Sequence, residues 1–140
     1  MAKQPKNIAA SVRQRLLNLA REEQRVFNVV LVAFGLERLI YRLSISDYRD
    51  RFVLKGGRFT RDVDFLGFGD DDEGQLKAAF AKILAMDVND GLTFDVADIS
   101  ASDIREDQVY GGKRLKTTAY LGKTRIPITI DLGFGDALGD

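Results

Sequence analysis

Three aspartates of this chain, Asp62, Asp64 and Asp131, are spaced so that their carboxylates could act together. Asp62 and Asp64 alternate with apolar residues along 62–65, and Asp131 lies in the apolar run 126–132. Side chains alternate between the two faces of a strand, so Asp62 and Asp64 share one face. Asp131 likewise lies opposite the isoleucines of its run. If the two strands are neighbours, three carboxylates converge outside an apolar sheet.

Carboxylates so close repel one another and are tolerated best around a divalent cation. Ligands that are all oxygen suit Mg²⁺ or Mn²⁺ holding a nucleotide's phosphates. The pattern therefore predicts a metal-dependent phosphoryl-transfer site in which Asp62, Asp64 and Asp131 are the catalytic and metal-binding residues. The alternative is an exposed sheet face with scattered acids, because Asp-x-Asp recurs on solvated strand edges.

A second candidate feature is Lys55-Gly56-Gly57, which follows the apolar run 52–54. Paired glycines let backbone N–H groups approach a phosphate without obstruction by a Cβ atom. Lys55, Arg58 and Arg61 add donors that could neutralise a triphosphate. The alternative is a plain turn whose charges face solvent or pair with the aspartates.

Two further charged runs have simpler explanations. The acids of 70–73 are typical of a helix start, where they cap free N–H groups and match the helix dipole. A basic cluster lies on one expected hairpin and is usual for a solvated face, although it could guide an RNA strand. Its members are Lys113, Arg114, Lys116, Lys123 and Arg125.

Composition restricts the chemistry further. The 140 residues are 45% apolar and 30% charged, which is ordinary for one globular domain, and the formal net charge is zero. The chain has no Cys and no His, which excludes disulfides, thiolate or imidazole catalysis and Cys/His metal sites. The longest apolar stretch, 29–34, is too short to span a membrane, so we expect a cytoplasmic protein.

The periodicity predicts an α/β (α+β) fold, with an N-terminal helical segment over 1–50 packed on a mixed sheet over 51–140. The expected helices are 8–22, 23–43 and one opening after 70–73 with a core stripe of Leu76, Ala79, Phe80, Ile83 and Leu84. The expected strands are 52–54, 62–68, 92–94 and 99–104, followed by a hairpin of 112–121 and 125–132 around Gly122-Lys123.

Taken together, segments 52–57, 61–65 and 128–136 resemble the AbiEii/AbiGii toxin family of nucleotidyltransferases. These are DNA-polymerase-β-like enzymes of bacterial toxin–antitoxin and abortive-infection systems. The N-terminal segments 11–13 and 36–38 are also similar, so the resemblance covers essentially the whole chain. It implies that the mixed sheet is of the nucleotidyltransferase type.

The resemblance also implies roles for residues. Gly56 and Gly57 would cradle the phosphates of an NTP, with Lys55 and Arg61 beside them. Asp62 and Asp64 would bind the metals, Mg²⁺ or Mn²⁺, and Asp131 would complete the site and help to activate the acceptor hydroxyl. The expected acceptor is RNA, such as tRNA, or a protein hydroxyl, and the expected protein partner is a cognate antitoxin.

The sequence departs from the family pattern in two ways that bear on NTP binding. A helix separates the Gly-Gly turn from the Asp-x-Asp strand in this superfamily, whereas here only residues 58–61 intervene. Family members also continue into a helical C-terminal part beyond the position of Asp140. We therefore expect weak or absent NTP binding by this form. A non-catalytic nucleotide- or partner-binding module and a metal-dependent phosphohydrolase or nuclease stay as alternatives.

Overall fold

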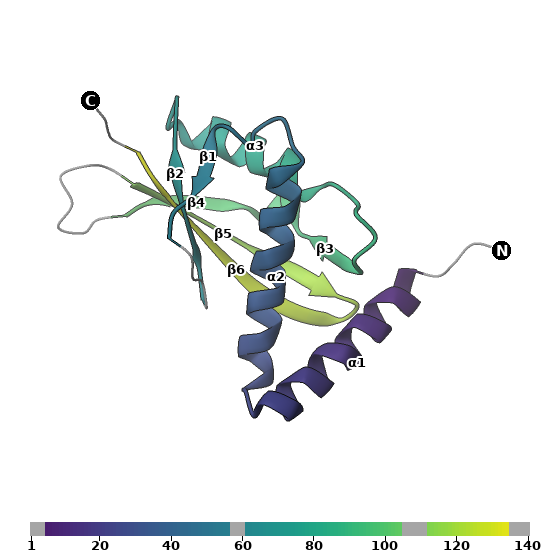
Figure 1. Cartoon of the computed structure of the whole chain (residues 1–140). Coiled ribbons are helices and arrows are strands. Elements are labelled where there is room, and N and C mark those ends of the chain that lie inside the picture. Colours follow the sequence, from purple (N-terminus) through teal and green to yellow (C-terminus); the bar gives the residue numbers. More distant parts are fainter. Residues whose placement is uncertain (1–4, 57–60, 105–111, 135–140) are drawn as a thin grey trace.

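A computed structural model of the chain describes residues 5–56, 61–104 and 112–134. Gly57 and residues 58–60 of the short connection lie outside these ranges. The described elements are α1 (Pro5–Glu23), α2 (Phe27–Ser44), β1 (Phe52–Leu54), β2 (Val63–Gly67), α3 (Glu73–Leu84), β3 (Leu92–Phe94), a 3₁₀ turn (Val96–Asp98), β4 (Ser100–Asp103), β5 (Gly112–Leu121) and β6 (Thr124–Gly133). Helices with a mixed sheet confirm the α/β class (Figure 1).

One sheet of six strands forms the body of the molecule. Its order is β1-β2-β6-β5-β3, with β4 also on β5. The β2–β6 pair is parallel and the other pairs are antiparallel. The turn at Gly122 and Lys123 joins β5 to β6 as predicted, and this hairpin is the longest pairing of the sheet.

The two N-terminal helices are separated by a break that the sequence pattern places slightly too early. Gln24 takes a left-handed conformation with φ 54°. The N–H of Arg25 then donates to the carbonyl of Ala20 at 2.9 Å, which satisfies an end carbonyl of α1. A glycine usually occupies such a position, so a break made by glutamine leaves little signal in the sequence.

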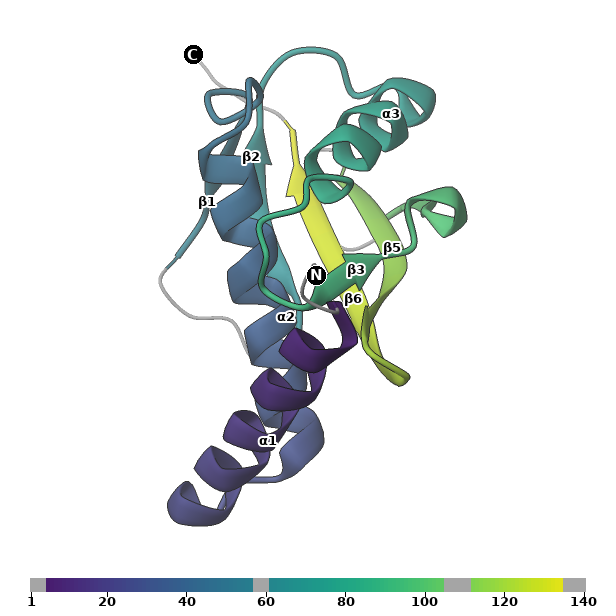
Figure 2. The same cartoon turned by 90° about the vertical axis from the view of Figure 1, so that its right-hand side faces the viewer.

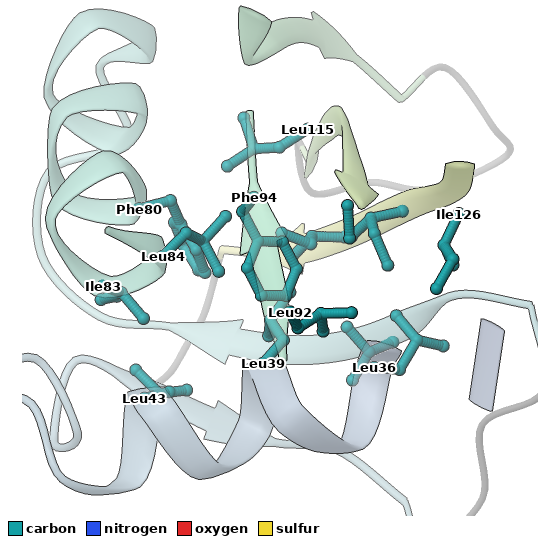
Figure 3. Packing of buried hydrophobic residues seen from close by; sticks show 14 of the residues in the cluster. Leu36, Leu39, Leu43, Phe80, Ile83, Leu84, Leu92, Phe94, Leu115 and Ile126 are labelled. Carbon is teal, nitrogen blue, oxygen red and sulfur yellow. The ribbon is translucent and has the colours of Figure 1, made fainter. Parts of the chain in front are cut away.

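The core lies between the sheet and the helices α2 and α3, which cover one of its faces (Figure 2). Leucines of α2 point toward the apolar stripe of α3 and the strands beneath it (Figure 3). A Cβ at Gly35 would lie 3.0 Å from Cδ1 of Ile128, so glycine lets α2 approach β6 closely. The predicted stripe of α3 is confirmed, since each member is buried: Leu76, Ala79, Phe80, Ile83 and Leu84.

The strand β1 is less buried than its apolar sequence predicts. Phe52 is buried, with its ring centroid 4.9 Å from that of Phe80. Val53 is 44% exposed and Leu54 37% exposed. Val53 lies opposite Leu66, which is 41% exposed, so both project to the face away from the helices. Leu54 ends an edge strand that pairs with β2 alone. The face of the sheet opposite the helices is thus open, and polar residues of the inner strands lie on it.

Candidate functional site

A row of four charged residues crosses the open face of the sheet. Asp64 of β2 lies opposite Asp131 of β6, and Asp131 lies opposite Arg114 of β5. Lys55 follows β1, and its N–H donates to the carbonyl of Asp64 at 2.8 Å. Residues directly opposite in neighbouring strands project to the same face. We call Lys55, Asp64, Asp131 and Arg114 the charged row, in which two acids lie between two bases.

Asp131 is held by a two-pronged ion pair. Nε of Arg114 donates to Oδ1 of Asp131 at 2.7 Å, and Nη2 donates to Oδ2 at 2.9 Å. The Arg114 side chain is 36% exposed and that of Asp131 is 14% exposed. Two parallel charge-assisted hydrogen bonds fix the orientation of a carboxylate and balance its negative charge. The arginine therefore occupies both oxygens of the third predicted metal ligand.

Asp64 is electrostatically strained by its neighbours. Partial desolvation raises its pKa, and the charges of Asp131 and Asp62 raise it further. The charges of Lys55 and Arg114 oppose the increase without cancelling it. A raised pKa means that the ionised carboxylate is disfavoured where it stands, and a cation beside it would relieve that cost.

Of the three predicted acids, the structure pairs two directly and places the third nearby. Asp64 and Asp131 are direct partners, and Asp62 lies just before β2, close enough for its charge to act on Asp64. Within the described residues, no group of three or more acidic side chains is arranged to hold a metal ion. The opposed carboxylates of Asp64 and Asp131, with oxygen donors alone, fit the ligand chemistry of Mg²⁺ or Mn²⁺.

The predicted phosphate-binding residues are only partly described. Gly56 has φ 76°, and a Cβ there would meet nothing within 4 Å. Glycine is therefore favoured at residue 56 by the backbone conformation rather than by a lack of space. Gly57 lies outside the described residues. Lys55 and Arg61 are both exposed, on either side of the connection between β1 and β2.

The basic cluster of the hairpin is split between the two faces. Arg114, Lys116 and Arg125 have the strand parity of Asp131 and lie on the open face. Lys113 instead pairs with Asp103 at 2.6 Å. The specific role of Arg114 was not predicted from the sequence. Counting outward from the Gly122-Lys123 turn does pair Arg114 with Asp131, so the hairpin register is the signal that could have found it.

A hollow of about 470 Å³ lies elsewhere, between Ile8, the end of α3 and the segment 84–96. No member of the charged row lines it.

Comparison with known families gives the class of protein. A family model for a nucleotidyl transferase, the AbiEii toxin of type IV toxin–antitoxin systems, matches residues 58–140, more than half of the chain. The fold and the carboxylate pair thus accompany a nucleotidyltransferase sequence. The chain belongs to the AbiEii toxin family, and the resemblance seen in the sequence is confirmed. No curated protein and no solved structure matches the chain.

Membership in this family has two further consequences. The match contains Asp62, Asp64, Arg114 and Asp131, so most of the charged row lies in the family's own region. A toxin of a toxin–antitoxin system implies an antitoxin partner. In the described part of the chain, no helix is both long and apolar enough to cross a bilayer.

Proposed function

We propose that this protein is the toxin component of its system and a metal-dependent nucleotidyltransferase. It moves a nucleoside monophosphate from an NTP to an RNA acceptor, such as tRNA, or to a protein hydroxyl. The observation that carries the proposal is the direct pairing of Asp64 with Asp131, inside the region that matches the family. Two carboxylates facing each other above a buried sheet have no role in packing.

Each residue has a part in the proposed reaction. Asp62, Asp64 and Asp131 would hold Mg²⁺ or Mn²⁺, which offsets the charge of the phosphates and of the attacking oxygen. Asp131 accepts the proton of the acceptor hydroxyl. The acceptor oxygen bonds to the α-phosphorus while the bond to pyrophosphate breaks.

The substrates also need binding groups outside the carboxylates. The exposed Lys55 and Arg61, with the backbone of Gly56, lie on the β1–β2 side of the aspartates and donate to the NTP phosphates. Lys116 and Arg125 on the open face would contact an RNA backbone. Because the face is uncovered by helices, the acceptor can be much larger than a nucleotide.

A second candidate is a nucleotide- or partner-binding module that keeps the fold without catalysis. The ion pair between Arg114 and Asp131 favours it, because both oxygens of Asp131 are engaged and no three-acid group is arranged for a metal among the described residues. The two candidates differ in product, so they can be separated directly.

The test is incubation of the protein with each α-³²P-labelled NTP and total RNA. Mg²⁺ or Mn²⁺ is present at about millimolar concentration, in excess over the protein. At NTP concentrations high enough to offset the weak binding expected of this chain, we expect label in RNA with the wild type and none with Asp64→Asn. Bound nucleotide without labelled product would support the binding module. Shortened RNA without label would support a phosphohydrolase or nuclease and overturn the transferase proposal.

A further inference from the structure

We infer that Arg114 competes with the divalent cation for Asp131. It binds the Asp131 carboxylate when no cation is present and must release it for the cation to bind. The inference rests on the proposed metal site. It assigns Arg114 a competing role, so that its removal tightens metal binding instead of weakening it. The opposite is expected of a residue that merely orients a metal ligand.

The geometry of the pair supports competition. Arg114 uses Nε and Nη2 for the two oxygens of Asp131, so the lone pairs that face Arg114 are occupied by its N–H groups. A cation seated between Asp131 and Asp64 would also lie close to the guanidinium charge. Like charges at such a distance repel, and the repulsion acts against whichever of the two arrives second.

The position of Arg114 in the charged row explains why the ion pair exists. Asp64 and Asp131 are direct partners, so two carboxylates of like charge lie side by side. Arg114 lies on the other side of Asp131 and binds both of its oxygens. The arginine therefore supplies, within the chain itself, part of the positive charge that a cation would supply.

A comparison within the molecule separates this pair from a structural one. Arg42 is 1% exposed, and besides Asp90 it donates to the carbonyls of Met86 and Leu92. Such a residue cannot move without leaving several buried groups unsatisfied. Arg114 is 36% exposed and lies on the open face, where water reaches its guanidinium.

The test measures the dissociation constant of Mn²⁺ for the full 140-residue chain, by the loss of the free-ion EPR signal. We expect Arg114→Gln to bind Mn²⁺ about tenfold more tightly than the wild type, equivalent to about 1.4 kcal/mol. Arg114→Lys keeps the charge but lacks the two-pronged geometry, so its constant should fall between the two. It also provides the comparison if the glutamine variant does not fold.

Lys116→Gln is the matched control. Lys116 lies two residues from Arg114 on the same strand and face, but its partner across β6 is Thr129. Lys116→Gln changes the net charge by the same amount as Arg114→Gln but frees no carboxylate. Any gain in Mn²⁺ affinity that comes from net charge alone therefore appears in both variants. The inference requires the gain to be clearly larger for Arg114→Gln.

Two results would overturn the inference, and they differ in what they say of the proposed function. If Asp64→Asn weakens Mn²⁺ binding but Arg114→Gln binds no more tightly than Lys116→Gln, the metal site stands and the role of Arg114 is refuted. If Asp64→Asn and Asp131→Asn bind Mn²⁺ as the wild type does, the metal site is refuted together with the competition at Asp131.

Discussion

Asp64 and Asp131 lie directly opposite each other on the parallel strands β2 and β6, between two pairs of buried residues. Val63 is paired with Ile130 on one side, and Phe65 with Leu132 on the other. All four apolar side chains belong to the core. A slip of one residue would turn them outward and the carboxylates inward. The core thus fixes the register that keeps two like charges together.

The first prediction concerns Asp64→Asn in the absence of metal. Because the folded-state pKa of Asp64 is raised above its usual value of 3.8, the native state binds more protons than the unfolded state just above that pH. The contribution of Asp64 to stability therefore falls as the pH rises from 3.8 through the folded-state pKa. Asp64→Asn should remove this loss and be no less stable than the wild type at pH 7, as measured by urea unfolding at several pH values.

The same variant should lose the stabilisation that metal gives. A ligand that binds only the native state raises the melting temperature. We expect millimolar Mg²⁺ or Mn²⁺ to raise that of the wild type and to leave that of Asp64→Asn nearly unchanged. Asp98→Asn, at an exposed acid outside the charged row, is the control and should respond as the wild type does. A melting temperature of the wild type that is unchanged by metal would contradict the prediction.

A second prediction separates the two explanations of Gly56. Alanine at φ 76° is strained, and Gly56→Ala should lower the free energy of unfolding by about 1–2 kcal/mol. Gly122, with φ 63° in the distant hairpin turn, gives a matched control of similar strain. If residue 56 contacts phosphates, only Gly56→Ala should also weaken NTP binding per folded molecule, measured by equilibrium dialysis.

Because only residues 58–61 separate Gly57 from Asp62, this chain is expected to bind NTPs weakly. The comparison of affinities therefore belongs in a family chain with a longer connection after the same two glycines. Gly57→Val, the corresponding change at the next residue, is expected to weaken NTP binding there beyond its effect on folding. Equal affinities in the glycine variants and the parent would make the turn a structural feature alone. Tight NTP binding by the 140-residue form would show that the short connection after Gly57 is sufficient.

Much of the site could be predicted from strand parity. Alternation along 62–65 and 126–132 placed the aspartates opposite the core, and a two-residue turn determines the register of β5 against β6. The pairing of β2 with β6 joins segments more than 60 residues apart, and no local pattern specifies it. From the sequence, the convergence of the aspartates could be predicted only on the condition that these two strands are neighbours.

Other features depend on tertiary surroundings that local patterns do not contain. The apolar run 52–54 predicts a buried strand, yet Val53 is exposed because it projects, with Leu66 opposite it, to the uncovered face of the sheet. Arg42 lies in the apolar stripe of α2 and is buried, because Asp90 and three carbonyls accept hydrogen bonds from its guanidinium. A charged residue in a helical stripe gives no sign of such a partner.

A third prediction concerns the packing that supports β2. The ring of Phe80 in α3 lies 4.9 Å from that of Phe52 and 6.4 Å from that of Phe65, measured between centroids. Phe80→Ala should lower the free energy of unfolding by about 3–5 kcal/mol, since it removes a fully buried ring. Phe68→Ala, at a residue 52% exposed, should cost much less. Similar losses in urea unfolding would contradict this account of the core.

The last prediction concerns the buried ion pair that joins α2 to the turn before β3. Asp90 accepts hydrogen bonds from Nη1 and Nη2 of Arg42 at 2.8 and 3.1 Å, and from Nε of Arg38 at 2.9 Å. Burial by itself raises the pKa of Asp90, but the bonds from Arg42, Arg38 and the N–H of Leu92 outweigh it and the pKa is lowered. Its stabilisation is therefore complete above the usual value of 3.8 and is lost as the pH falls through the folded-state pKa.

Asp90→Asn should lower the free energy of unfolding at pH 7 by about 3–5 kcal/mol, because the change leaves the buried guanidinium of Arg42 without its counter-charge. Glu23→Gln, which breaks the exposed pair with Arg25, should cost less than about 1 kcal/mol. Urea unfolding at pH 7 and near pH 3 measures both. Since the wild type loses the ion pair in acid and the variant has none to lose, the gap between them should narrow at low pH. A gap that stays constant would mean that Asp90 acts through its shape and hydrogen bonds alone, without its charge.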